Sequence, residues 1–263
     1  MTETTVEPFV LKEQSGGVVT LTLNRPGQFN ALSSEMLSAL QAALDEVGQD
    51  ETARVVVLAA AGKAFCAGHN LKEMRAHPTK EWQRDLFDQC SRVMLTLTRI
   101  PQPVIARVHG IATAAGCQLV AQCDLAVASE NATFATSGIN YGLFCSTPGV
   151  AVSRNLGRKQ AFEMLFTGAF IDAEEAMRRG LVNRVVPPVR LDAEVAALCE
   201  AIVAKSRVAV ETGKRLFYGQ LEAGLAAAYD QAAEAMACNM LAEDALEGID
   251  AFIEKRKPVF KGR

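Results

Sequence analysis

The sequence lacks the features that mark several large classes of protein. Its formal net charge is only −3 over 263 residues, so it has no basic surplus of the kind that binds nucleic acid. No apolar run is long enough to span a bilayer, and the first eight residues contain neither the cationic nor the apolar segment of a secretory leader. We therefore expect no nucleic-acid partner and no membrane partner.

Histidine is scarce, and the cysteines lack the spacing of a metal site or a disulfide framework. The three histidines are scattered at positions 69, 77 and 109, and none of the seven cysteines belongs to a Cys-x-x-Cys pair. An odd number of thiols without such spacing is typical of reduced cysteines in a cytosolic protein. We therefore expect a cytoplasmic location and no metal site.

What the sequence contains up to about residue 190 is an alternation of strand and helix patterns. Residues 18–23 alternate in hydrophobicity, as in a half-buried strand. Residues 54–59 and 104–108 are short apolar runs that suit strands buried on both faces. Beyond residue 190 the chain is rich in alanine and shows helix patterns without a strand. We therefore predict an α/β core over residues 1–190 and a helical region over residues 191–263.

The stretch from residue 104 to residue 124 joins a buried strand to a helix that begins on small side chains. The pattern predicts a helix over residues 112–122, whose first five residues, Ala112 to Gly116, are all small. A helix start carries unpaired N–H groups and a partial positive charge. Small residues there would let an anion or a polarised carbonyl oxygen approach closely. Tight packing of the helix on a sheet explains the same composition, and the sequence alone leaves both explanations open.

Apolar residues mixed with glycine and proline predict a loop with an apolar lining over residues 138–150. Cys145 and Ser146 lie in this loop. A nucleophile at either position would need a neighbouring base, and the sequence supplies none nearby. We therefore interpret both side chains as the lining of a pocket.

Short motifs spread over nearly the whole chain follow one another in a fixed order. They are Asn24-Arg25-Pro26, Phe65-Cys66-Ala67-Gly68, Gly116-Cys117-Gln118-Leu119, Phe166-Thr167-Gly168 and Phe252-Ile253-Glu254-Lys255. Each motif is weak alone, but together their order and spacing resemble the crotonase superfamily, the enoyl-CoA hydratase/isomerase proteins. Residues 112–121 and 142–150 narrow the resemblance to one group within that family.

The resemblance implies a spiral of ββα units followed by helices that build a homotrimer or a dimer of trimers. It also implies that the protein binds an acyl-CoA thioester and holds the thioester oxygen between two backbone N–H groups, which map onto His69 and Ala115. Preorganised donors of this kind stabilise an enolate or a tetrahedral oxyanion. CoA is then part of the substrate, and no separate cofactor is implied.

The catalytic positions depart from the family pattern. Hydratases of this family use two glutamates, one to take a proton from water and one to supply a proton to carbon. The first position holds Gln118, whose amide cannot act as a base near neutral pH, and the second falls at Gly138. One hypothesis is a hydratase- or isomerase-like enzyme of fatty acid metabolism with non-standard proton carriers. The other is a non-catalytic acyl-CoA-binding or regulatory protein.

Further residues are candidates for contacts with the ligand. The turn around the first oxyanion donor supplies Ala67, Gly68, Asn70, Leu71 and Lys72. Arg25 and Lys255 suit the CoA phosphates, although an exposed basic group that touches nothing explains Lys255 as well. Phe252 could pack on the adenine, with a helix interface as the alternative.

The side chain of His69 has two possible roles. The imidazole could titrate near neutral pH beside the ligand, or it could point away while only the backbone acts.

The helical region carries too many large apolar groups to lie free in water. They include Leu216, Leu221, Leu225, Tyr229 and Met236. We therefore expect this region to lie at the subunit contacts of a trimer or hexamer.

Overall fold

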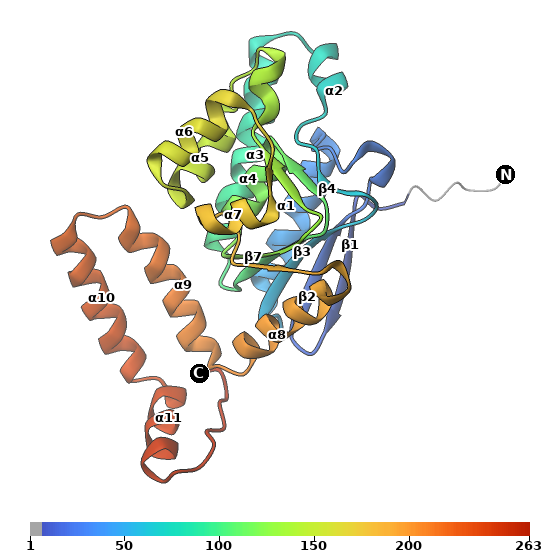
Figure 1. Cartoon of the computed structure of the whole chain (residues 1–263). Coiled ribbons are helices and arrows are strands. Elements are labelled where there is room, and N and C mark those ends of the chain that lie inside the picture. The colour runs from blue at the N-terminus through green and yellow to red at the C-terminus, as the bar shows by residue number, and fades with distance from the viewer. Residues whose placement is uncertain (1–6) are drawn as a thin grey trace.

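The computed structural model describes residues 7–263 and shows two sheets with helices packed around them (Figure 1). Within that part of the chain, the large sheet has six strands and the small sheet four. The large sheet contains, in spatial order, β1 (Val10–Ser15), β2 (Val18–Leu23), β3 (Val55–Ala60), β5 (Val104–Val108), β7 (Leu125–Ser129) and β10 (Arg184–Val186). The small sheet contains β4 (Ala64–Cys66), β6 (Ile111–Thr113), β8 (Thr133–Ala135) and β9 (Ile171–Asp172).

Helices connect the strands up to β10 and make up most of the chain after it. The helices before β10 are α1 (Ser34–Gln49), α2 (Leu71–Ala76), α3 (Lys80–Arg99), α4 (Ala115–Gln122), α5 (Ser146–Asn155), α6 (Arg158–Thr167) and α7 (Ala173–Arg179). Those after it are α8 (Leu191–Val203), α9 (Arg207–Leu221), α10 (Leu225–Met240) and α11 (Glu243–Ile253). This order confirms the predicted α/β body with a helical C-terminal region.

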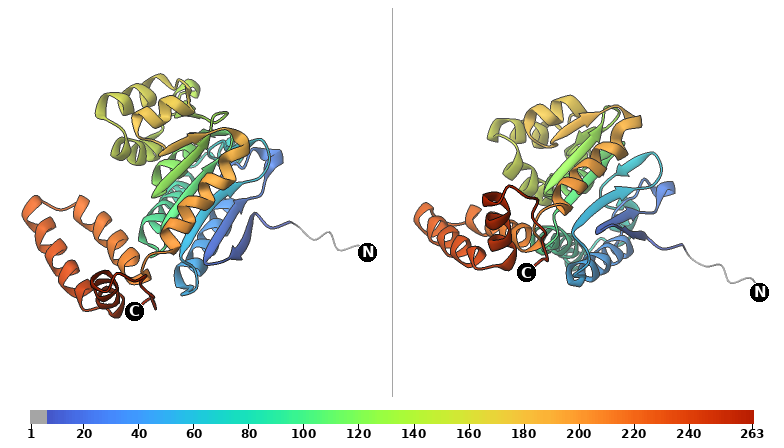
Figure 2. Two further views of the ribbon diagram at one scale, coloured as in Figure 1. Left: turned by 60° about the horizontal axis from the view of Figure 1, so that its bottom comes forward. Right: turned by 90° about the horizontal axis from the view of Figure 1, so that it is seen from below.

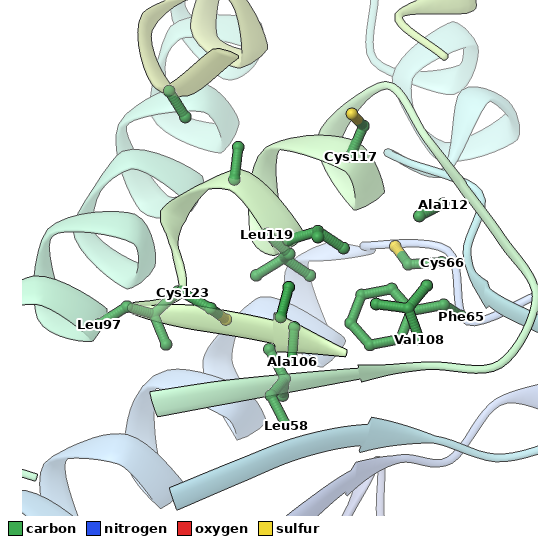
Figure 3. Close-up of a cluster of buried hydrophobic side chains, with 14 of the residues drawn as sticks. Leu58, Phe65, Cys66, Leu97, Ala106, Val108, Ala112, Cys117, Leu119 and Cys123 are labelled. Carbon is green, nitrogen blue, oxygen red and sulfur yellow. The ribbon is translucent and has the colours of Figure 1, made fainter. Parts of the chain in front are cut away.

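The main hydrophobic core lies between the large sheet and helices α1, α3 and α4 (Figure 3). Strand β3 is buried at every position, as its continuous apolar run predicts. Its neighbours β2 and β5 both run parallel to it. Helix α1 begins where the Ser33 side chain accepts a hydrogen bond from the Met36 N–H, and it buries one apolar face on this core.

Helix α8 covers the opposite face of the large sheet (Figure 2). Leu191, Val195 and Cys199 pack there against side chains of β3, β5 and β7. Helices α9, α10 and α11 form an arm that extends away from the body (Figure 1). Helix α8 therefore completes the body although it follows residue 190, and the division of the chain at that residue stays a prediction.

A buried polar cluster attaches the arm to the body. The Asp124 carboxylate accepts hydrogen bonds from the Lys214 ammonium group at 2.7 Å and the Tyr218 hydroxyl at 2.7 Å, both on α9. It also accepts one from the Val104 N–H at 2.6 Å, at the start of β5. The Lys214 ammonium group donates further to the carbonyl oxygens of Leu97 and Gln102. Asp124 thus orders the backbone at the start of β5 and holds α9 against the body.

Two predicted elements differ from the structure. The helix expected over residues 112–122 begins only at Ala115, because Ala112 and Thr113 pair with β8 and belong to the small sheet. The loop expected over residues 138–150 ends at Cys145, because α5 begins at Ser146. Pro148 lies in the first turn of α5, where a missing N–H leaves no helical hydrogen bond unmade. Among residues 7–263, we find no helix with the length and hydropathy needed to cross a membrane.

Candidate functional site

A cavity of about 410 Å³ lies between the start of α4, the turn before α2 and the segment that leads into α5. The predicted site residues that line it are Ala67, His69, Leu71, Ala115, Gly138, Cys145 and Ser146. Gly68, Gln118, Asn70, Lys72, Arg25, Phe252 and Lys255 do not line it. The structure therefore brings together residues from three distant segments of the chain, and it places the predicted cationic contacts elsewhere.

The two predicted oxyanion turns touch each other. Gly68 has a φ of 91°, and a Cβ at that position would lie 2.9 Å from the Cβ of Ala114 and 3.2 Å from the backbone nitrogen of Ala115. Only a residue without a side chain allows so close an approach. Gly116 is as tightly placed, because a Cβ there would lie 2.1 Å from the carbonyl oxygen of Cys66. Close packing therefore explains Gly116, whereas the approach of an anion or a carbonyl oxygen to the helix start at Ala115 stays a prediction.

Among residues 7–263, the backbone N–H groups of His69 and Ala115 donate none of the hydrogen bonds that order their surroundings. Ala115 is the first residue of α4, so its N–H precedes the first intrahelical bond, which Gln118 makes to Ala114. Leu32 bonds to the residues on either side of His69, through the Gly68 oxygen and the Asn70 nitrogen. In a parallel bridge of this kind, the N–H of the central residue points away from the partner. It is therefore available to a ligand.

The imidazole of His69 is held in an apolar environment. Its ring meets the ring of Phe87 edge to face with 5.3 Å between centroids, and its Nε2 is buried without a hydrogen-bond partner among residues 7–263. Burial lowers the pKa of His69 to about 4. The imidazole is therefore neutral at physiological pH, which argues against the alternative that it titrates near neutral pH beside the ligand.

The two positions that the family resemblance assigns to catalytic glutamates, Gln118 and Gly138, are closely packed. Gln118 is only 4% exposed, lies three residues after Ala115 on the same face of α4, and has an unpartnered buried Oε1 within the described chain. A Cβ at Gly138 would lie 2.6 Å from the carbonyl oxygen of Leu143 and 2.9 Å from the Cys145 sulfur. No aspartate or glutamate of residues 7–263 lines the cavity. The site therefore offers backbone donors and no carboxylate.

Asn70 and Arg25 have structural roles that the sequence did not indicate. The Asn70 side-chain oxygen caps α2 by accepting hydrogen bonds from the N–H groups of Lys72 and Glu73. The Arg25 guanidinium donates to backbone oxygens of Glu7, Pro8 and Asn24 and stacks 3.6 Å above the Phe9 ring. These contacts hold the chain before β1 in place. The proposed contacts of Asn70 and Arg25 with a ligand stay predictions.

The remaining candidates differ in position and exposure. Leu71 lines the cavity from α2, and Lys72 is exposed on the same helix. The Ser146 hydroxyl donates to the Phe144 carbonyl oxygen at 3.3 Å. Phe252 is 85% exposed on α11 and Lys255 follows that helix, on the arm and away from α2 and α5 (Figure 1). In residues 7–263, no three His, Cys, Asp or Glu side chains are grouped so that they could hold a metal ion.

The fold and the paired turns define a protein of the crotonase type, and comparison with known proteins agrees. The family model for enoyl-CoA hydratase/isomerase matches residues 13–263. Human enoyl-CoA hydratase domain-containing protein 3, mitochondrial, is 45% identical over 247 residues, which cover 94% of this chain and 82% of that protein. An enoyl-CoA hydratase crystal structure from Mycobacterium smegmatis is 62% identical with a TM-score of 0.96, covering 97% of this chain and 99% of the other. The chain belongs to the enoyl-CoA hydratase/isomerase family.

These comparisons settle three predictions. The crotonase-type fold is confirmed, and so is the narrower resemblance carried by residues 112–121 and 142–150, which is to enoyl-CoA hydratase domain-containing protein 3. The crystal structure of the human protein of that name has a TM-score of 0.93 at 44% identity and covers 97% of this chain and 100% of that chain. The expected cytoplasmic location is wrong, because these relatives are mitochondrial. Reduced thiols distinguish reducing from oxidising compartments and do not separate one reducing compartment from another.

Proposed function

We propose that this protein binds acyl-CoA thioesters in the cavity and holds the thioester oxygen between the N–H groups of His69 and Ala115. The contact between the Gly68 turn and the start of α4 supports the proposal, because it brings together His69 and Ala115, which line the same cavity. The partial positive charge of the α4 start favours an oxygen that gains negative charge. CoA belongs to the ligand, and we propose no separate cofactor.

We further propose that the protein hydrates enoyl-CoA poorly. The observation that carries this is the absence of any carboxylate lining the cavity within residues 7–263. Gln118 can accept or donate a hydrogen bond but cannot exchange a proton near neutral pH, and Gly138 has no side chain to do so. Each lost acid–base group typically costs about 10²- to 10⁴-fold in rate. The same observation favours the second candidate function, a non-catalytic acyl-CoA-binding or regulatory protein, over an enzyme of fatty acid metabolism.

The arm supports a homotrimer or a dimer of trimers. Large apolar side chains that are mostly exposed on it include Phe217, Leu225, Tyr229, Met236, Leu241 and Phe252. An exposed apolar surface of this kind is typical of a protein–protein interface. Because Phe252 and Lys255 lie on the arm, away from the cavity of their own chain, we propose that they meet the ligand of a neighbouring subunit.

Calorimetry with butyryl-CoA and a spectrophotometric hydration assay with crotonyl-CoA test the two parts of the proposal. We expect binding of both esters and turnover far below that of ordinary hydratases. Gly68→Ala should lose binding, because its methyl group would push the two turns apart. Gly16→Ala is the matched control, since it also places alanine at a positive φ, 57°, but has no atom within 4 Å. Absence of binding would overturn the first part, and hydration at ordinary rates the second.

A further inference from the structure

Two hydroxyl groups meet at the wall of the cavity. Ser137 lines the cavity, and its Oγ lies 2.7 Å from the Oγ1 of Thr113, which is a hydrogen-bond distance. Thr113 pairs with Ala135 where β6 meets β8, and Ser137 follows β8 by two residues. The pairing of these two strands therefore brings the hydroxyls together, although they are 24 residues apart in the chain.

The hydroxyl pair adjoins both the proposed oxyanion donor and a position of the family's catalytic pattern. Thr113 comes two residues before Ala115, and Ser137 comes directly before Gly138. The family resemblance assigns Gly138 to the second glutamate, and the glutamates of hydratases act on the water that adds across the acyl double bond. With a thioester oxygen at Ala115, this part of the wall therefore lies on the side of the α- and β-carbons of a bound acyl group.

The pair leaves hydrogen-bonding capacity unused. Within residues 7–263, neither hydroxyl makes a hydrogen bond other than the one they share. A hydroxyl donates once and accepts twice, and either oxygen can be the donor in this contact. When Thr113 donates, the Ser137 proton is available to a carbonyl oxygen in the cavity. When Ser137 donates, its lone pairs can accept from a ligand hydroxyl, so Ser137 suits a neutral oxygen of either kind.

The rest of the wall disfavours a charged acyl group. No Lys, Arg, Asp or Glu of residues 7–263 lines the cavity, and the His69 imidazole is neutral because burial lowers its pKa to about 4. The Ser146 hydroxyl already donates to the Phe144 carbonyl oxygen. A charged substituent would lose its hydration here without gaining an ion partner, whereas a neutral oxygen needs one hydrogen bond.

We propose that Ser137 is a specificity-determining residue that recognises a neutral oxygen on the β-carbon of the acyl group. On this proposal, 3-hydroxyacyl-CoA and 3-oxoacyl-CoA bind more tightly than the saturated ester of the same length. The proposal rests on the proposed function, because the thioester oxygen must lie at the N–H groups of His69 and Ala115. Recognition forms and breaks no covalent bond, so it requires neither of the glutamates of the hydratase pattern.

Calorimetry of the full-length protein with four CoA esters tests the proposal. Butyryl-CoA has no oxygen on its β-carbon, 3-hydroxybutyryl-CoA and acetoacetyl-CoA carry a neutral one, and malonyl-CoA has a carboxylate there. The net free energy of a neutral hydrogen bond corresponds to about 2- to 10-fold in affinity. We expect the two esters with a neutral oxygen to bind more tightly than butyryl-CoA by about that factor, and malonyl-CoA to bind most weakly.

Removal of the hydroxyl should abolish this preference. Ser137→Ala should lower the affinities for 3-hydroxybutyryl-CoA and acetoacetyl-CoA to that for butyryl-CoA, and it should leave the affinity for butyryl-CoA unchanged. Ser153→Ala is the matched control, because it removes a hydroxyl from an exposed position of α5 that does not line the cavity. This control should keep the preference of the parent chain.

Several results would overturn the proposal. Equal affinity of the parent chain for butyryl-CoA and 3-hydroxybutyryl-CoA would do so, and this comparison needs no variant to fold. An equal loss of affinity for all esters in Ser137→Ala would mean that the serine only shapes the cavity. A preference abolished by Thr147→Val would assign recognition to another hydroxyl of the wall. Failure of the parent chain to bind any of the four esters would instead overturn the proposed function, and the same titrations distinguish that outcome from a lost preference.

Discussion

The ring and the backbone of His69 lie in different environments. The backbone N–H points away from Leu32 and is free, whereas the ring packs against Phe87 and carries an unpartnered Nε2 within the described residues. A substitution of the side chain therefore leaves the proposed oxyanion donor in place. This separation makes His69 a residue where two roles can be tested one at a time.

The pH dependence of stability should report the buried ring. Burial lowers the pKa of His69 from 6.5 to about 4, so between these values the unfolded chain binds a proton that the folded chain does not. The free energy of unfolding then falls as the pH drops through this window, by up to about 1.4 kcal/mol per pH unit. Between pH 7 and pH 5, urea unfolding should show a smaller decrease in the free energy of unfolding for His69→Gln than for the parent chain. His77→Gln, at an exposed histidine, should behave as the parent; equal losses in all three would contradict the prediction.

Gly138 should be intolerant of any side chain. A methyl group there would lie 2.6 Å from the Leu143 carbonyl oxygen, which cannot move without its loop. Overpacking of this kind costs about 1–3 kcal/mol, so Gly138→Ala should lower the denaturation midpoint. Gly213→Ala is the control, because no atom lies within 4 Å of its Cβ position in α9 and alanine favours the helix. A midpoint that does not fall for Gly138→Ala would show that the loop adapts. A glutamate at position 138 would have the same close contact between its Cβ and the Leu143 carbonyl oxygen.

The start of α4 depends on a residue in an unusual conformation. Ala114 has a φ of 51° and a ψ of −118°, and its N–H donates to the Ala135 oxygen at 2.9 Å. A side chain at positive φ crowds the backbone, so the helix begins on a strained residue with no side-chain cap. The packing of Gly68 and Gly116 around the turn holds it in place. The strain lies directly before the proposed oxyanion donor.

Relief of this strain should stabilise the fold. Ala114→Gly should raise the free energy of unfolding by about 1 kcal/mol, because glycine adopts positive φ without steric cost. The same change at Ala121, inside α4, should instead lower it by at least about 1 kcal/mol. Urea denaturation of the two variants gives both values. A loss of stability for Ala114→Gly would mean that contacts of the methyl group outweigh the strain.

The attachment of α9 to the body should depend on one buried ion pair. Lys214→Met would leave the Asp124 carboxylate, 2.7 Å from the Lys214 ammonium group in the parent, without its cation. Loss of one partner of a buried pair costs about 3–5 kcal/mol. The exposed pair of Lys12 with Glu46 is the control, since Lys12→Met should cost at most about 1 kcal/mol. If Lys214→Met and Lys12→Met lowered the free energy of unfolding equally, the buried pair would contribute no more to stability than the exposed one.

At the scale of the whole molecule, we expect the arm to form the contacts between subunits. Light scattering at micromolar concentration should give a mass of three or six chains, because the apolar side chains of α9 to α11 need cover. Tyr229→Glu combined with Met236→Glu should shift the mass toward one chain. Val189→Glu, at a residue 90% exposed outside the arm, should not. A monomeric parent chain would rule out the proposed assembly.

Elements with strong local patterns could be predicted well, and those that exist only through tertiary pairing could not. Residues 104–108 form β5 as expected, and residues 18–23 form β2 as their alternating hydrophobicity predicts. Strands β4 and β6 have only three residues each, and they are held by pairing with each other. Short segments of this kind carry no periodicity long enough to detect.

The residues of the candidate site also divide into those that the sequence revealed and those whose roles appeared only in the folded structure. Motif order identified the family and pointed to His69, Ala115, Gln118 and Gly138, because side-chain identity is written in the sequence. The roles of Asn70 and Arg25 were missed, since their partners become neighbours only after folding. The Asx-type spacing of Asn70 before α2 was the one local signal that could have revealed its cap.

The sequence by itself determined the family and the α/β body with its helical C-terminal region, since these depend on which residues are present and in what order. Tertiary structure alone decided that the Gly68 turn meets the start of α4, that the His69 ring is buried, and that the Cys145 sulfur fills the space beside Gly138. The physical reason is that free N–H groups, pKa values and steric exclusion arise from groups brought together from distant parts of the chain. No local pattern records those distances.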